Sequence, residues 1–279
     1  MLIFTLLLAQ STSWDPPMAN PLKIQSRAGL VLKRSELRDL SLRVTYPTSG
    51  GPYPVIVLSH GMYGSEDGLL PLSSFWAEHG YVVVQPTHDD SMRYADAETR
   101  RGALAGKLDN TKNWNQRPKD ISLILDKLSE VSRLVGKGMP KMNTKSIGMA
   151  GHSYGAWTTQ VIAGMKLGPL SFADPRPRAF ISIAPSGTRR GQIGNPFEAM
   201  RGPMLFISGD NDSTGVTGDV ATFRKEAFLR SPSGGKTLMW IDGADHSFAG
   251  INGQARNRSN PLQVEQIQKT TLAFWDAHL

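Results

Sequence analysis

A serine lies at the centre of the pentapeptide Gly151-His152-Ser153-Tyr154-Gly155. The motif follows an apolar run at residues 146–150 and precedes a stretch of helical character at residues 156–165, and this strand–turn–helix context exposes a serine hydroxyl. Glycines two positions to either side let the strand and the helix approach closely. The helix N-terminus favours negative charge that develops beside it. The pentapeptide therefore predicts that Ser153 is a nucleophile.

A serine hydroxyl is a weak nucleophile, so Ser153 requires a general base. Two histidines follow it in the chain, His246 and His278. His246 comes shortly after an apolar run at residues 237–241, which predicts a loop at the carboxyl end of a strand. His278 is the penultimate residue, at the end of a predicted helix. We predict that His246 is the base, because a strand-end loop can lie at the same sheet edge as Ser153.

The base needs an acid to orient it, and hydrolases with this motif follow the chain order nucleophile, acid, histidine. The loop Gly209-Asp210-Asn211-Asp212-Ser213 follows an apolar run at residues 204–208. We predict that Asp212 is the acid and keep Asp210 as the alternative, since one of the two can form an Asx turn instead. Asp242 and Asp245 share the loop of the histidine and are weaker candidates.

The oxyanion that forms during acyl transfer requires two backbone N–H donors. One is expected from Tyr154, the residue after the nucleophile. The segment Ser59-His60-Gly61-Met62-Tyr63-Gly64 follows an early apolar run, and its glycines allow a tight turn that directs an N–H inward. We predict Met62 as the second donor, with Tyr63 as the alternative. His60 is expected to brace this loop rather than to act as a base or a metal ligand.

Residues 87–117 form the least regular part of the chain, and long irregular insertions in compact domains are often functional. We expect this insertion to wall or cover a pocket. Tyr63, His88 and Trp114 are the tentative pocket residues.

Apolar runs alternate along the chain with stretches of helical spacing. Strands are predicted at residues 40–46, 55–58, 81–84, 146–150, 179–184, 204–208 and 237–241. Helices are predicted at residues 69–79, 118–135, 156–165, 219–229 and 261–278. The alternation predicts an α/β fold with a mostly parallel sheet and helices on both faces. The short stretch between Ser153 and Asp212 leaves little room for a large cap, so no large cap domain is predicted.

The composition argues against several other functions. The chain has 279 residues and no cysteine, which excludes thiolate catalysis, disulfides and cysteine-based metal sites. The net charge of +7 comes from scattered residues without an aromatic-interleaved basic stripe, so no nucleic-acid partner is expected. Metal-ligand spacing, a phosphate loop and a dinucleotide fingerprint are absent from the sequence, so neither a metal nor a cofactor is predicted.

The N-terminus begins with an apolar run at residues 2–9 that is too short to cross a bilayer. It is similar to the apolar part of a secretory signal peptide but lacks the positive residues that usually precede it. We expect residues 1–20 to be a signal peptide or a disordered segment, and residues 21–279 to form one catalytic domain. Secretion or a periplasmic location is the expectation and a cytoplasmic location the alternative. No later segment is long enough to be an integral membrane span.

Several stretches resemble the α/β-hydrolase superfamily, in particular the dienelactone hydrolase and platelet-activating-factor acetylhydrolase-like esterases. The similarity covers roughly residues 40–279 and includes Pro54–Gly61, Glu78–Pro86, Arg117–Ile121, Gly151–Gly155, Ile207–Asp212 and Gly243–His246. It implies hydrolysis of carboxylic esters without a cofactor and supports the roles of Ser153, His246 and Asp212. The chain departs from dienelactone hydrolases proper, which use a cysteine nucleophile. It also reads Thr87-His88-Asp89-Asp90 where the family often has Asp-His-Pro-Gly.

The sequence thus predicts a serine hydrolase that forms an acyl-enzyme from small-molecule, lipid or polymer esters. Two alternatives remain open at this point: a serine peptidase or amidase on the same fold, and a binding protein that has kept the fold without catalysis. Parallel assays with esters and peptide anilides would distinguish an esterase from a peptidase or amidase. Labelling with a fluorophosphonate would distinguish an enzyme from a binding protein.

Overall fold

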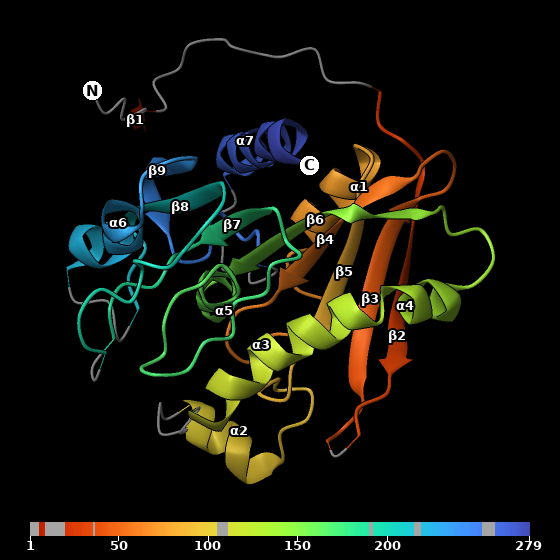
Figure 1. The fold of residues 1–279 in the computed structure, drawn as a ribbon, viewed down its shortest axis with the longest axis horizontal. Coiled ribbons are helices and arrows are strands. Elements are labelled where there is room, and N and C mark those ends of the chain that lie inside the picture. Colours follow the sequence, from red (N-terminus) through yellow and green to blue (C-terminus); the bar gives the residue numbers. More distant parts are fainter. Residues whose placement is uncertain are drawn as a thin grey trace.

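Nine strands form one sheet in the computed structural model, which describes residues 6–8, 20–35, 37–104, 111–189, 192–214, 219–252 and 260–279. The spatial order is β1-β9-β8-β7-β6-β4-β5-β3-β2 (Figure 1). The strands are β1 (Leu6–Leu8), β2 (Ile24–Leu32), β3 (Leu40–Pro47), β4 (Tyr53–Ser59), β5 (Val82–Thr87), β6 (Met142–His152), β7 (Ala179–Ile183), β8 (Met204–Asn211) and β9 (Lys236–Asp245). Strand β3 pairs antiparallel with β2 and β5, and every other pairing is parallel. The predicted α/β fold with a mostly parallel sheet is confirmed.

The central strands are buried on both faces because helices cover both. In β4, Val55 and Val57 belong to one hydrophobic cluster and Ile56 and Leu58 to the other. This is the alternation that a strand imposes on successive side chains.

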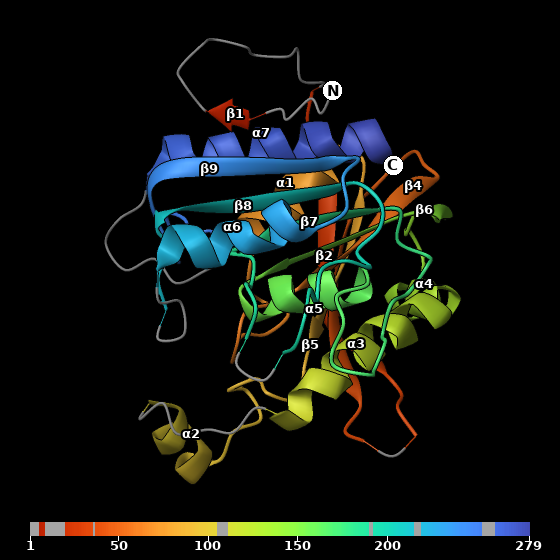
Figure 2. The same ribbon diagram turned by 60° about the vertical axis from the view of Figure 1, so that its left-hand side comes forward.

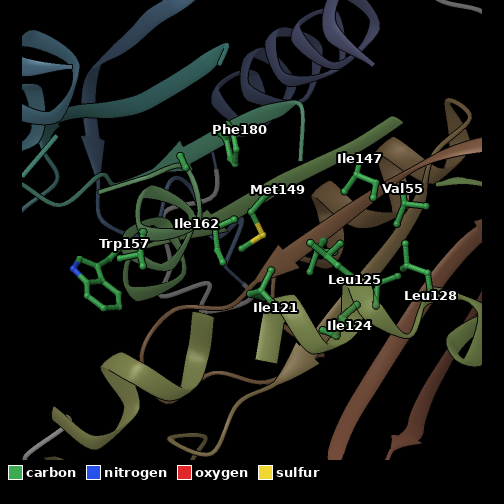
Figure 3. Close-up of a cluster of buried hydrophobic side chains, with 14 of the residues drawn as sticks. Val55, Ile121, Ile124, Leu125, Leu128, Ile147, Met149, Trp157, Ile162 and Phe180 are labelled. Carbon is green, nitrogen blue, oxygen red and sulfur yellow. The ribbon is translucent and has the colours of Figure 1, made fainter. Parts of the chain in front are cut away.

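The helices divide between these two clusters (Figure 2). Helices α1 (Leu70–Glu78) and α7 (Pro261–His278) contribute buried residues to one face. Helices α3 (Thr111–Asp126), α4 (Leu128–Val135) and α5 (Tyr154–Ile162) contribute to the other, where α6 (Val220–Arg230) adds Ala227. Figure 3 shows part of this second cluster, with residues of α3 and α4 beside Ile147 and Met149 of β6. The strand ends that carry the predicted site residues are therefore held between two packed layers.

The predicted helix at residues 118–135 is wrong in its bounds. The structure has two helices there, and α3 begins at Thr111, so Pro118 lies inside a helix rather than at its start. A proline inside a helix is unfavourable, but Trp114 packs against Trp157 and Arg117 is fully buried, so tertiary contacts support the turn before the proline. Within residues 87–117, which were predicted to be irregular, the structure also has α2 (Ala97–Leu104).

Two strands were not predicted. Strand β2 is mostly exposed and shifts register between Arg27 and Leu30, so it lacks a clear apolar alternation. Strand β1 is an edge strand that pairs with β9, and it lies in the predicted N-terminal segment 1–20. Apart from residues 6–8 and 20, that segment lies outside the described residues. Among the helices of the described ranges, none combines the length and apolar character that spanning a bilayer requires.

Candidate active site

The turn from β6 into α5 places Ser153 in a strained backbone conformation. Its φ is 57° and its ψ is −112°, which is rare for a residue with a side chain. A Cβ on Gly151 would lie 2.2 Å from the carbonyl oxygen of Gly155, and one on Gly155 would lie 2.0 Å from that of Ser59. Only glycine fits at either position, so the two glycines allow the sharp turn that projects the serine hydroxyl beyond the sheet.

Ser153, His246 and Asp212 form a continuous hydrogen-bonded chain at the carboxyl edge of the sheet. The hydroxyl of Ser153 lies 2.9 Å from Nε2 of His246, and Nδ1 of His246 lies 2.6 Å from Oδ1 of Asp212. The three residues follow directly after β6, β9 and β8, whose parallel ends share one edge. With the proton of the imidazole on Nδ1, His246 donates to the carboxylate and accepts from the serine. This arrangement can remove the proton from the Ser153 hydroxyl as that oxygen attacks.

The carboxylate of Asp212 is completely buried but well supplied with donors. Ser208 donates to Oδ2 at 2.7 Å, and Nη2 of Arg224 lies 3.1 Å from Oδ1. A buried charge is tolerated when it is paired and hydrogen-bonded in this way. The alternative acid, Asp210, is exposed and accepts instead from the indole N–H of Trp240 and the backbone N–H of Gly243. These bonds lower the pKa of Asp210, that from Trp240 most strongly. The structure thus brings Asp212, and not Asp210, into contact with the imidazole.

Arg224 of α6 anchors the loop that carries Asp212 and was not identified from the sequence. Its Nε donates to the backbone carbonyl of Asp212 at 3.0 Å, and its Nη1 donates to those of Ala184 and Pro185 at 3.1 and 2.8 Å. Burial lowers the pKa of Arg224, an effect that the charge of Asp212 opposes. Because it joins the ends of β7 and β8, Arg224 holds Asp212 in place relative to the sheet. An arginine in a polar helix gives no sequence signal for such a role.

His152, next to Ser153, supports the loop that carries His246. Its Nε2 donates to the backbone carbonyl of His246 at 2.8 Å, and the two ring centroids are 4.9 Å apart. Burial lowers the pKa of His152 to about 3. The ring is therefore a neutral spacer between the elbow and the histidine loop.

The two predicted oxyanion donors belong to segments next to Ser153. Tyr154 is the first residue of α5, and its side chain is buried. Met62 lies three residues beyond the end of β4 and has an exposed side chain. A Cβ on Gly61 would be 3.6 Å from that of Ser153, so the loop that carries Met62 passes directly beside the nucleophile.

His60 holds this loop through two hydrogen bonds of its ring. Its Nε2 accepts from the backbone N–H of His88 at 3.0 Å, which leaves the proton on Nδ1, and Nδ1 donates to the carbonyl of Gly61 at 2.6 Å. Burial lowers the pKa of His60 well below its usual value, as does the charge of Arg117. Both ring nitrogens are occupied by backbone groups, in keeping with the predicted bracing role.

The prediction that His88 contributes to the substrate pocket is wrong. Its side chain is completely buried. Both ring nitrogens have partners inside the protein, since Nε2 accepts from the hydroxyl of Ser59 at 3.0 Å and Nδ1 donates to Asp120 at 2.8 Å. A strand-end position in the sequence does not tell which way a side chain points, and this one points into the protein. Tyr63 is half-buried with a φ of 65°, and half-buried Trp114 packs against Trp157 of α5. Their contact with a substrate stays a prediction.

Within the described ranges, no group of three or more histidine, aspartate or glutamate side chains is arranged to bind a metal ion. The geometry that stands out at this edge is thus the chain of Ser153, His246 and Asp212.

Comparisons with known proteins agree with this architecture. No curated protein matches the sequence. Among solved structures, the "Putative Dienelactone Hydrolase" from Klebsiella pneumoniae subsp. pneumoniae MGH 78578 superposes with a TM-score of 0.61 over 91% of this chain and 99% of its own. The two sequences are 16% identical, so this likeness concerns the fold alone. The profile of the dienelactone hydrolase family matches residues 41–278, and the chain therefore belongs to the dienelactone hydrolase family of α/β-hydrolases.

Proposed function

We propose that the chain is a serine hydrolase that cleaves carboxylic esters through an acyl-enzyme intermediate. The observation that carries this proposal is the hydrogen-bonded chain from the hydroxyl of Ser153 through His246 to the buried Asp212. The dienelactone hydrolase family supports hydrolysis in general. The absence of cysteine from the chain makes serine the nucleophile of this proposal.

The reaction begins when His246 takes the proton of Ser153 and the serine oxygen attacks the ester carbonyl. The carbonyl oxygen becomes an oxyanion, held by the backbone N–H groups of Met62 and Tyr154. His246 then gives its proton to the leaving alkoxide as the ester C–O bond breaks. A water molecule, deprotonated by the same histidine, then attacks the acyl group. The bond between the acyl carbon and the Ser153 oxygen breaks, His246 returns the proton to that oxygen, and the acid is released.

Asp212 stabilises the imidazolium that forms when His246 is protonated. Because Ser208 and Arg224 already hold the carboxylate, little reorganisation is needed when that charge appears.

The substrate we propose is a small ester. The side chain of His246 is 28% exposed, so solvent and a small ligand reach it without movement of a lid. In the described part of the chain, the connection from β7 to β8 contains no helix or strand that could form a cap. Esters at lipid or polymer surfaces fit the same open edge. We expect faster turnover of p-nitrophenyl acetate and butyrate than of long-chain esters, and a strong preference for long chains would contradict an open site.

The direct test is Ser153→Ala with p-nitrophenyl butyrate as substrate. The expected loss is nearly all of the covalent turnover, on the order of 10⁶-fold when such a nucleophile is removed. Ser171→Ala, at an exposed loop serine, is the matched control and should keep the full rate. Wild-type turnover by a folded Ser153→Ala protein would refute the proposal, and peptide anilides assayed in parallel separate esterase from amidase activity.

A further inference from the structure

Arg117 is a buried arginine that lies beneath the proposed oxyanion loop. It belongs to α3, and its side chain is 1% exposed. Its Nε and Nη2 bind the two carboxylate oxygens of Asp90 at 2.9 and 2.8 Å. Its Nη1 donates to the backbone carbonyl of His60 at 2.7 Å, and Nη2 also donates to that of Gly61 at 3.1 Å. A guanidinium that binds one carboxylate in a fork and two successive carbonyls is held in a single orientation.

The contact with Gly61 bears on the direction of a proposed oxyanion donor. The carbonyl of Gly61 and the N–H of Met62 belong to the same peptide group, which is planar and points its C=O and N–H in opposite directions. Arg117 and the Nδ1–H of His60 both hold that carbonyl oxygen on the inner side. The N–H of Met62 is therefore directed away from the arginine. A positive charge on the carbonyl also polarises the peptide, which strengthens its N–H as a donor.

The same guanidinium contacts the residue that carries the other proposed donor. Its central carbon lies 4.1 Å from the ring centroid of Tyr154, the first residue of α5. Burial is the largest influence on the pKa of Asp90 and raises it, but the charge and hydrogen bonds of Arg117, together with His60 and His88, lower this pKa below its usual value. Asp90 in turn accepts the backbone N–H of Tyr63 at 3.3 Å. Arg117 and Asp90 thus connect the loop after β4 with the start of α5.

We infer that Arg117, held by Asp90, is a positioning residue that fixes both N–H donors of the oxyanion hole relative to Ser153. This inference rests on the proposed function, because it concerns the same reaction. Arg117 should affect the transition state, because the oxyanion forms only after Ser153 has attacked. Misplacement of the donors should therefore lower kcat and leave KM nearly unchanged.

The test uses Arg117→Lys, which keeps the positive charge but loses the fork that holds Asp90 and the two carbonyls. Removal of one oxyanion donor typically costs about 10²–10³ in rate, so loosening of the donors should cost about 10–100-fold in kcat. The matched control is Arg176→Lys. Arg176 makes a similar set of bonds, to Asp174 and to the carbonyl of Ser122, in a network that does not include the loop after β4. The control should keep kcat within about twofold.

A transition-state analogue separates positioning from a purely structural role. A trifluoromethyl ketone accepts the oxygen of Ser153 and forms a tetrahedral oxyanion, while the serine proton passes to His246. For Arg117→Lys, its affinity should fall by the same factor as kcat/KM, with KM for p-nitrophenyl butyrate unchanged. If Arg117→Lys does not fold, Asp90→Asn is the second variant, because it loosens the same fork. We expect the same fall in kcat and in affinity for the ketone, with KM unchanged.

Wild-type kcat in folded Arg117→Lys, or a loss of kcat without loss of affinity for the ketone, would overturn the inference. An equal loss of kcat in Arg176→Lys would also overturn it, because the effect would then be general. These outcomes differ from failure of the proposed function, in which Ser153→Ala would keep its turnover whatever the Arg117 variants do.

Discussion

Substitution of Gly155 by alanine tests how closely the nucleophile turn packs against the oxyanion loop. In a helix, alanine is favoured over glycine by about 1 kcal/mol, so propensity alone predicts a stabilised α5. The structure predicts the opposite. The added Cβ would lie 2.0 Å from the carbonyl oxygen of Ser59 and 2.8 Å from that of His60, both of them backbone atoms. The first of these distances is about 1.4 Å short of ordinary van der Waals contact.

Relief of this clash requires α5 and the end of β4 to separate, and these segments carry the two proposed oxyanion donors. We expect a net loss of stability of about 1–3 kcal/mol and a fall in kcat of about 10²-fold, because displacements near 1 Å have effects of that size. Thermal unfolding and p-nitrophenyl butyrate kinetics measure both quantities. Gly68→Ala is the matched control, since its Cβ would make only ordinary contact, 3.4 Å from the carbonyl of Ser65. Wild-type stability and kcat in Gly155→Ala would refute the reasoning.

Three further predictions concern the buried polar groups around the triad. Asp212→Asn should lower kcat by about 10⁴-fold, the size of loss seen when such an acid no longer fixes the histidine tautomer, while Asp210→Asn should stay within about twofold; equal effects would show that the acid is misassigned. Arg224→Met should lower the free energy of unfolding in urea by about 3–5 kcal/mol, because it leaves the buried carboxylate of Asp212 without its cation; an unchanged midpoint would contradict this. Acid should destabilise the protein, since burial lowers the folded-state pKa of each of three histidines while the unfolded chain binds their protons below pH 6.5. For each such histidine the free energy of unfolding falls by about 1.4 kcal/mol per pH unit between its unfolded and folded pKa values. For His152 these pKa values are 6.5 and about 3. Urea titrations that give the same free energy of unfolding at pH 7 and at pH 5 would rule this out.

Much of the fold could be predicted from the sequence because its central strands are continuous apolar runs. Strands β4, β7 and β8 are buried on both faces, and such runs stand out between glycine- and proline-rich turns. Strand β2 could not be recognised in this way, since most of its side chains are exposed and its register with β3 shifts between Arg27 and Leu30. The early start of α3 depends on tertiary contacts of Trp114 and Arg117, which no local pattern contains.

The same distinction between local pattern and tertiary contact decides which site residues could be predicted. Ser153, His246 and Asp212 could be selected because each follows a recognisable strand, and parallel strand ends share one edge. His88 also follows a strand, but its side chain enters a buried network, and position along the chain does not distinguish the two cases. Arg117 and Arg224 lie on helices, and the residues they hold lie on loops elsewhere in the chain. A buried, paired arginine and a solvated one look the same in a sequence, so only the coordinates show their contacts.

The central claim is that Ser153 is the nucleophile, activated by His246. It is tested most directly by reaction of the folded protein with a fluorophosphonate, followed by mass spectrometry of the proteolytic peptides. We predict one phosphonyl group per chain on the hydroxyl of Ser153, formed at a rate that falls by several orders of magnitude in His246→Ala. A folded protein that stays unlabelled, or that carries the adduct on another residue, would contradict the account.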